Sequence, residues 1–197
     1  EPFPFPIPDI RDQLDRLAGR TYYCSLDCAS FFHEFEIVES HRSLTAFVTP
    51  WGQKLQWKRV PFGLKNAPAH CQKQFQELLA KSGNPFLQDI IPYFDDCAFG
   101  ADTIDELCQK FEALLAIAVK HGLKFKESKC ILGTRAIAHL GFIVNAEGIH
   151  IDPRRIDRLL RMSAAKDVDD IRHILGAFGF CRAWLADSAS ICAPLTD

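Results

Sequence analysis

Residues 90–100 form an apolar and aromatic segment that is interrupted at its centre by two adjacent carboxylates, Asp95 and Asp96. β-Forming residues on both sides of an acidic pair predict two strands joined by a tight turn. Pro92 is unfavourable in this segment, because proline cannot donate a hydrogen bond to a sheet ladder. The segment therefore predicts a sheet that carries two carboxylates at a strand turn.

A third carboxylate, Asp27, ends another predicted strand. Residues 21–27 are rich in β-formers, and their alternation places Tyr23, Ser25 and Asp27 on one face. A sheet can aim Asp27 and Asp95 into one cleft, although they are 68 positions apart in the sequence. Two facing carboxylates suit a pair of Mg²⁺ ions, which prefer oxygen ligands and activate an in-line attack on phosphorus. Asp-Asp is also a common turn dipeptide, so its surroundings decide between the two interpretations.

Helical and strand patterns alternate along most of the chain, and only helical patterns follow residue 152. Apolar residues recur at helical spacing over residues 9–18, 66–81, 102–120, 153–162 and 167–185. Further strands are predicted over residues 44–49, 54–60 and 136–144. The first two of these flank a turn at residues 50–53 and are expected to form a hairpin.

Charge and hydropathy limit the class of protein. The net charge of −2 and the pI near 6.4 are unlike those of a strong, autonomous nucleic-acid binder, although basic residues cluster at 54–59, 120–129 and 154–161. No apolar run reaches the ~20 residues of a membrane-spanning helix. The first eight residues lack the basic and apolar regions of a signal peptide. We expect a water-soluble protein without a membrane partner.

The eight cysteines are scattered through apolar segments, as buried thiols are. This distribution predicts a reducing, intracellular compartment, either cytoplasm or nucleus. Cys24, Cys28 and His33 resemble half of a zinc site, but no second pair at finger spacing completes it. Core packing is the favoured interpretation of these cysteines.

The acidic turn and the first strand resemble two motifs of reverse transcriptases. Tyr93-Phe94-Asp95-Asp96 resembles the aromatic-x-Asp-Asp box, and Ser25-Leu26-Asp27 followed by Phe32-His33 resembles the first aspartate motif of that family. Residues 60–69 are similar to the segment that positions template and nucleotide in polymerases of Gypsy-type LTR retrotransposons. The resemblance continues in chain order through residues 122–130, 139–142, 146–153, 174–176 and 193–196.

This resemblance implies an α+β fold, in which the antiparallel sheet of a reverse-transcriptase palm is backed by helices and followed by a small helical thumb. It divides the chain into a palm-like domain with an extended N-terminal lead-in, residues 1–151, and a thumb- or connection-like segment, residues 152–197. The implied activity is RNA-directed DNA synthesis by two-metal nucleotidyl transfer. The implied partners are an RNA or DNA template-primer and dNTP.

The resemblance also implies roles for individual residues. Asp27, Asp95 and Asp96 are expected to be catalytic and to bind two Mg²⁺ or Mn²⁺ ions, and Lys129 is expected to protonate the departing pyrophosphate. Phe32 is expected to be the steric gate against a 2′-hydroxyl, although a phenylalanine there is equally typical of a core. Phe62, Gly63 and Tyr93 are expected to contact the nucleotide or the template. Leu140 and Gly141 are expected to belong to the primer grip.

Several residues depart from the family pattern. Phe31 stands where the family usually has glycine, Cys28 and Ala29 replace its usual residues after the aspartate, and Pro92 interrupts the strand before Asp95. Segments similar to the family's fingers and RNase H have no counterpart in the 197 residues. Because the fingers supply basic residues for the triphosphate, we expect weak dNTP binding and poor primer extension.

Two functions are consistent with these features. The first is a reverse-transcriptase polymerase unit whose remaining parts are supplied from elsewhere. The alternative is a domesticated palm and thumb, catalytically weak or inactive, that serves as a protein-interaction or RNA-binding scaffold. An apolar surface formed by Phe3, Phe5 and the hairpin around Trp51 is expected to favour a protein partner or self-association.

Overall fold

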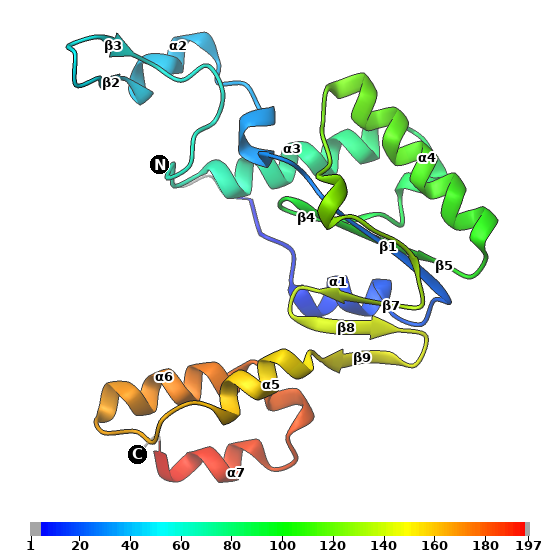
Figure 1. Cartoon of the computed structure of the whole chain (residues 1–197), viewed down its shortest axis with the longest axis vertical. Coiled ribbons are helices and arrows are strands. Elements are labelled where there is room, and N and C mark those ends of the chain that lie inside the picture. Colours follow the sequence, from blue (N-terminus) through cyan, green and yellow to red (C-terminus); the bar gives the residue numbers. More distant parts are fainter. Residues whose placement is uncertain (1–4, 196–197) are drawn as a thin grey trace. The chain divides into compact units, whose positions relative to one another are not determined.

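The computed structural model describes residues 5–195, and its fold is α+β, as predicted (Figure 1). The chain divides into two compact units. The first extends to His139 and also contains Val144–Ile149, and the second contains Leu140–Ile143 and continues from His150. Phe3 and Thr196, which belong to predicted features, lie outside the described residues. No helix within residues 5–195 has the length and hydropathy of a membrane span.

The first unit is built on a four-stranded sheet with the strand order β4-β5-β1-β6. β5 pairs antiparallel with β1 and with β4, and β1 pairs antiparallel with β6. All residues of β5 after the first are buried, which requires cover on both faces of the sheet. The strands are β1 (Tyr22–Asp27), β4 (Ile91–Tyr93), β5 (Asp96–Ala101) and β6 (Ile131–Thr134).

Helices supply this cover. α3 (Ala67–Lys81) and α4 (Ile104–His121) lie on one side of the sheet, and α1 (Ile10–Leu17) lies on the other (Figure 1). α1 begins at Asp9, whose carboxylate accepts hydrogen bonds from the first turn, and α4 ends at Gly122 with a φ of 75°. The helices predicted over these segments are confirmed.

The core of the first unit lies between the sheet and its helices. It contains Leu26 and Phe99 from the sheet and Phe75 and Leu114 from the helices. Cys24, Cys28, Cys71 and Cys97 belong to the same cluster, and all eight cysteines, which lie within the described residues, are free thiols. The prediction that Cys24 and Cys28 pack in the core is confirmed. Burial raises the pKa of the Cys71 thiol to about 12, so this thiol stays protonated and unreactive.

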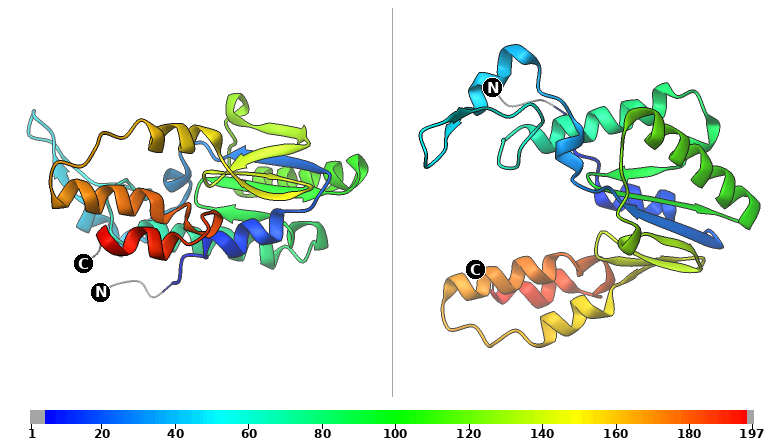
Figure 2. Two further views of the ribbon diagram at one scale, coloured as in Figure 1. Left: turned by 90° about the horizontal axis from the view of Figure 1, so that it is seen from below. Right: turned by 45° about the horizontal axis from the view of Figure 1, so that its top comes forward.

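The segment between β1 and α3 leaves the sheet. Its elements are η1 (Phe31–Glu34), α2 (Glu39–Arg42), η2 (Ser43–Thr45), β2 (Phe47–Val48) and β3 (Lys54–Leu55). The β2–β3 hairpin projects away from the sheet in every view (Figures 1 and 2). It is the predicted hairpin, but its strands are shorter than expected. The reason is that residues 58–60 pair with residues 35–37 instead of with the opposite strand.

A three-stranded sheet follows in the order β7-β8-β9, with bounds Ala136–His139, Phe142–Asn145 and Gly148–Ile151. The prediction of one strand over residues 136–144 is therefore wrong. Leu140 and Gly141 have φ values of 50° and 85° and form a two-residue turn between β7 and β8. Positive φ at both turn residues is the geometry that matches the twist of hairpin strands, so the apolar run folds back on itself.

The second unit is mostly helical. It contains α5 (Pro153–Leu160), α6 (Val168–Gly179) and α7 (Ser188–Cys192). The helix expected over 167–185 ends earlier, because η5 (Arg182–Trp184) replaces its last turn. Phe180 stacks on Phe142 with 4.3 Å between ring centroids, and the Arg155 guanidinium carbon lies 3.6 Å from the Phe180 centroid. The remaining 3-10 helices are η3 (Pro85–Leu87), η4 (Glu127–Lys129) and η6 (Ala193–Leu195).

Candidate active site

The carboxylates predicted at two distant positions meet on neighbouring strands. Asp27 is the last residue of β1, Asp96 is the first residue of β5, and the antiparallel register pairs them directly. Cα atoms of directly opposed residues lie about 4.5–5.5 Å apart in such a ladder. Asp95 precedes Asp96 in the turn, and its carbonyl oxygen accepts a hydrogen bond of 2.6 Å from the Cys28 N–H. The sheet therefore gathers all three carboxylates at one end of β1.

The acidic turn is tight and strained. Tyr93 pairs with Asp96, so Phe94 and Asp95 alone connect β4 to β5. Phe94 has a φ of 52°, a left-handed conformation that L-residues other than glycine rarely adopt. Backbone in such a region costs about 1–3 kcal/mol and persists only where its surroundings fix it. The Phe94 ring packs edge-to-face on Tyr93, with 4.8 Å between centroids.

Gln72 of α3 is the residue that holds this turn from behind. Its side chain is fully buried, donates a hydrogen bond of 2.8 Å to the Pro92 carbonyl and accepts one of 2.6 Å from the Phe94 N–H. Pro92 is tolerated because β4 is the edge of the sheet. We did not predict Gln72 as a site residue. The signal was present, since a polar residue on the apolar face of a helix needs a buried partner.

Lys129 lies beside the first carboxylate. Its Nζ is 2.6 Å from Asp27 Oδ2, and the Lys129 side chain is 53% exposed while that of Asp27 is 16% exposed. The loop that carries it is fastened to the end of β1, because the N–H groups of Lys126 and Ala29 donate to the carbonyls of Asp27 and Lys124, respectively. The hydrogen bond to Asp27 raises the pKa of Lys129, so its ammonium is charged at neutral pH.

Three acids at one place repel one another. Burial, together with the negative charges of Asp95 and Asp27, raises the pKa of Asp96 to about 6. Carboxylate oxygens are the ligands that Mg²⁺ prefers, and a cation relieves this repulsion. Residues 5–195 contain no group of three or more His, Cys, Asp or Glu side chains in a metal-binding arrangement, and Lys129 neutralises Asp27 instead. The donor type and the charge of the carboxylates suit a divalent cation, whereas their arrangement in this structure is that of an ion pair with Lys129.

A cavity of about 280 Å³ opens over these groups. Asp27, Asp95 and Lys129 line it together with Phe32 and Phe62. Five of the predicted site residues are therefore brought together in one cavity. Lys126, which we did not single out, also lines it and adds a second positive charge.

Phe31, which replaces the usual glycine of the family, also borders the cavity, but its ring is turned toward the core. It is only 3% exposed and lies 5.1 Å from the Phe35 ring and 5.7 Å from the Phe75 ring. The bulky side chain is therefore accommodated mostly in the protein interior.

The other predicted residues lie outside the cavity lining, including Asp96, which pairs with Asp27 in the sheet. Tyr93 is half-buried behind the acidic turn, and Gly63 lies in the exposed loop before α3 with a φ of 90°. Leu140 and Gly141 belong to the other unit. The φ of 85° at Gly141 disfavours any other residue, and a Cβ atom there would also displace the Arg155 guanidinium, which it would meet at 2.6 Å.

Residues 1–144 match the family described as reverse transcriptase (RNA-dependent DNA polymerase). The chain belongs to this family. Among its relatives, it is 32% identical over 196 residues to a retrovirus-related Pol polyprotein from transposon opus of Drosophila melanogaster, which aligns with all of this chain. It is 25% identical to the corresponding polyprotein from transposon gypsy of the same species, over 98% of this chain. The domain is thus reverse-transcriptase-like and of retroelement origin.

Solved structures share the fold. The foamy viral protease-reverse transcriptase in complex with double-stranded DNA superposes with a TM-score of 0.90 and 23% identity, over 100% of this chain and 34% of the other. The same kind of protein in complex with an RNA/DNA hybrid gives a TM-score of 0.86 at 23% identity, over 100% and 26% of the two chains. The chain spans about a fifth of the length of the opus and gypsy polyproteins, 19% and 18%.

Proposed function

We propose that this chain is the catalytic part of an RNA-directed DNA polymerase, which adds nucleotides from dNTP to a primer paired with an RNA or DNA template. The observation that carries the proposal is the pairing of Asp27 with Asp96 in the sheet, beside a cavity that also holds Asp95 and Lys129. The foamy viral structures contain an RNA/DNA hybrid or double-stranded DNA, which supports a template-primer as the partner.

In this proposal Asp27, Asp95 and Asp96 hold two divalent cations, Mg²⁺ or Mn²⁺, and divalent ions are general to the family's reaction. Such ions neutralise phosphate charge and activate the attacking hydroxyl. The chain's own contribution is to hold three carboxylates close together in a half-buried place, at the cost of mutual repulsion. The strained turn fixes Asp95 and Asp96 relative to Asp27, so little reorganisation remains for the reaction.

Lys129 is the proposed general acid. Its proton passes from Nζ to the oxygen of pyrophosphate that leaves the α-phosphate. The ion pair with Asp27 holds the ammonium beside the reacting groups, and its exposure leaves it able to turn toward the leaving group. General acid catalysis by one side chain contributes about 10²–10⁴-fold.

Two phenylalanines of the cavity are proposed to select the nucleotide. Phe32 and Phe62 are in edge-to-face contact, with 5.4 Å between their ring centroids, at the mouth of the carboxylate cavity. We assign Phe32 to the exclusion of a 2′-hydroxyl by bulk, and Phe62 with Gly63 to the nucleotide and template. Tyr93 is assigned to the same contacts, and Leu140 and Gly141 are assigned to the primer grip.

Two basic residues lie near the aspartates, although the fingers that supply such residues in the family have no counterpart in the sequence. They are Lys126 and Lys129, which line the cavity. Their presence favours nucleotidyl transfer over a purely scaffolding role, because charge neutralisation of the phosphates is a large part of that reaction.

Primer extension tests the proposal. The chain is incubated with an RNA template, a labelled DNA primer and dNTP in Mg²⁺ or Mn²⁺, and compared with Asp95→Asn. Asp105→Asn, which alters an exposed carboxylate in the first turn of α4, is the matched control. Extension by the chain and the control, but not by Asp95→Asn, is expected. RNA binding without extension by any of the three would instead support the scaffold function.

A further inference from the structure

Five aromatic rings form a continuous series between the β2–β3 hairpin and the carboxylate cavity. Neighbouring centroids lie 6.3 Å apart for Phe47 and Trp57, 5.5 Å for Trp57 and His33, 5.4 Å for His33 and Phe62, and 5.4 Å for Phe62 and Phe32. The Trp57 and His33 ring planes are parallel to within 4°. The last ring, Phe32, lines the cavity that holds Asp27.

A separate cavity of about 480 Å³ lies along this series. Its lining includes Phe47, Trp57, His33 and Phe62. Phe62 also lines the carboxylate cavity, so the two cavities share a wall. Trp57 is 40% exposed, Phe47 is 44% exposed and Phe62 is 72% exposed, so solvent reaches the rings.

The backbone holds Trp57 and His33 in place. The Trp57 N–H donates to Thr45 Oγ1 at 2.9 Å, and the Thr45 hydroxyl donates to the Arg42 carbonyl at 2.7 Å. His33 Nδ1 lies 3.0 Å from the Val60 carbonyl oxygen. The parallel rings are therefore fixed by hydrogen bonds on both sides, rather than by their own contact alone.

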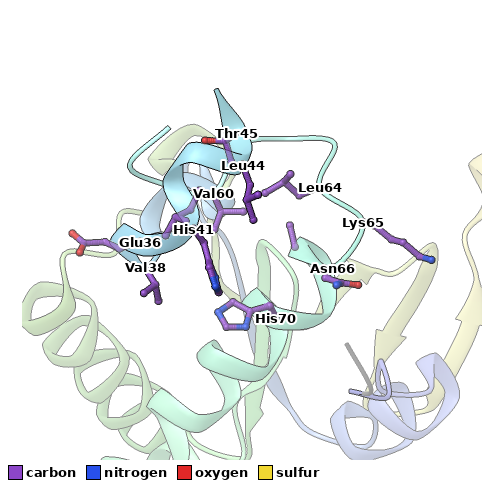
Figure 3. A pocket seen from close by; sticks show the side chains of 12 residues that line it. Glu36, Val38, His41, Leu44, Thr45, Val60, Leu64, Lys65, Asn66 and His70 are labelled. Carbon is purple, nitrogen blue, oxygen red and sulfur yellow. The ribbon is translucent and has the colours of Figure 1, made fainter. Parts of the chain in front are cut away.

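A neighbouring cavity of about 430 Å³ extends the same surface. It lies between α2 and the start of α3, and Leu44 and Leu64 point toward each other across it (Figure 3). Both leucines also line the aromatic cavity. The aromatic cavity therefore opens into a longer apolar trough instead of ending at Trp57.

The charge around the trough differs from that of the whole chain. Residues 40–76 contain no Asp or Glu and six Lys or Arg, whereas the rest of the chain has seventeen Lys or Arg against 25 Asp or Glu. Lys54, Lys58 and Arg59 are exposed beside Trp57. Arg59 pairs with Glu36, the one acidic residue among the described residues that line the two cavities of the trough. A locally basic surface with exposed aromatic rings is the combination that binds single-stranded nucleic acid, in which rings stack on bases and cations neutralise phosphates.

We propose that this aromatic cavity binds an unpaired base of single-stranded nucleic acid, stacked on Trp57, at the point where the template strand leaves the carboxylate cavity. The inference rests on the proposed polymerase function and adds a specific binding site to it. The exposed cations Lys54 and Lys58 favour a nucleic acid over an apolar protein segment as the occupant, because phosphates gain from nearby positive charge and an apolar segment does not.

A template-primer whose first unpaired template base is 2-aminopurine tests the inference, because stacking quenches the fluorescence of this base. The same template without primer is the second probe, and a blunt duplex is the third. Trp57→Ala is compared with Trp51→Ala, which removes a more exposed tryptophan of the same hairpin, outside the cavity lining. Trp57→Phe restores an aromatic ring, and circular dichroism checks the fold of each variant.

Quenching is expected with the unmodified chain and with Trp51→Ala, and it is lost in Trp57→Ala and partly regained in Trp57→Phe. Trp57→Ala weakens binding of the overhang about tenfold and leaves blunt-duplex binding unchanged. Equal quenching with and without Trp57, or equal affinity for overhang and blunt duplex, overturns the inference.

Primer extension on the same samples separates the two proposals. Extension without Trp57-dependent quenching refutes the base site and leaves the polymerase function standing. Trp57-dependent quenching of the single strand without extension supports the base site and refutes the polymerase function.

Discussion

At the scale of residues, the acidic turn depends on a side chain from another element. Gln72 satisfies one backbone donor and one backbone acceptor on either side of Tyr93, in a place that water does not reach. Without it, the Phe94 N–H and the Pro92 carbonyl are left without their partner, and the positive φ of Phe94 loses its main restraint.

We predict that Gln72→Leu lowers the free energy of unfolding by about 2 kcal/mol, because buried polar groups without partners cost about 1–3 kcal/mol. Primer extension is expected to fall as well, since the turn that carries Asp95 relaxes. Urea unfolding and extension rates measure the two effects. Gln74→Leu, an exposed position on the same helix, is the control and should change neither. An unchanged unfolding midpoint for Gln72→Leu would contradict this account of the turn.

Lys129 gives a second prediction at this scale. Lys129→Gln is expected to slow nucleotide incorporation about 100-fold or more, because the leaving pyrophosphate loses its proton donor. Single-turnover incorporation measures the rate. Lys129→Arg keeps the positive charge but does not readily give up a proton, so it tests whether the charge alone sustains the rate. Equal rates for the chain and Lys129→Gln would remove Lys129 from the catalytic residues.

Individual residues differ in how far the sequence predicts them. Asp27, Asp95 and Lys129 follow from motif position, and the structure places all three around one cavity. Gln72 does not, because its role depends on which strand its helix packs against. A single helix pattern indicates only that position 72 faces the core.

At the scale of elements, α4 is attached to the sheet by a buried lysine. The Lys110 side chain is 3% exposed, and its ammonium lies 2.8 Å from Glu106 Oε1 and 2.9 Å from both Asp89 Oδ2 and the Gly100 carbonyl oxygen. One charge thus connects α4, the loop before β4 and the end of β5. The Lys110 hydrogen bond also lowers the pKa of Glu106.

We predict that Lys110→Met lowers the free energy of unfolding by about 1–3 kcal/mol, because the Gly100 carbonyl and two carboxylates lose their shared donor. Because Asp89 is exposed, we expect a smaller loss of stability than that caused by breaking a fully buried ion pair. Urea unfolding compares this variant with Lys120→Met, an exposed position near the end of the same helix. Equal midpoints for the two variants would show that Lys110 does not fasten α4.

Element positions were more predictable than strand pairing. α1 and α4 follow from their spacing and caps, and both are confirmed. The run over residues 136–144 was predicted as one strand, because Leu140 gives no turn signal and adopts a positive φ only in the folded hairpin. β6 was not predicted either, since its exposed residues show no burial pattern.

At the scale of the whole molecule, stability depends on a histidine that is buried without a complete set of partners. His139 is 3% exposed, and its Nε2 has no hydrogen-bond partner among residues 5–195. Burial lowers its pKa from 6.5 to about 4. Between these two values the unfolded chain binds a proton that the folded chain excludes, so folding becomes less favourable as the pH falls.

We predict that the free energy of unfolding rises from pH 4 to pH 6.5 by up to about 3 kcal/mol through His139, and that this contribution is complete above pH 6.5. His139→Leu should flatten the profile over this range. Urea unfolding at a series of pH values measures it, with the exposed His121→Leu as control. An unchanged slope in His139→Leu would assign the pH dependence to other groups.

The fold of the whole molecule was predicted by a resemblance that extends along the sequence in order, and the superposition on reverse transcriptases confirms the α+β fold. The distribution of charge was harder to interpret from the sequence than the fold. A net charge of −2 conceals a segment of 37 residues without an acid, and only the structure shows that this segment carries the exposed rings beside the carboxylate cavity.

Single-nucleotide incorporation opposite each of the four RNA template bases tests the central claim most directly. The chain is expected to extend the primer by one residue only with the complementary dNTP in Mg²⁺ or Mn²⁺, and both Asp27→Asn and Asp95→Asn are expected to give no product. Absence of product with the unmodified chain, or equal product with either variant, would contradict the claim that these carboxylates form a working polymerase site.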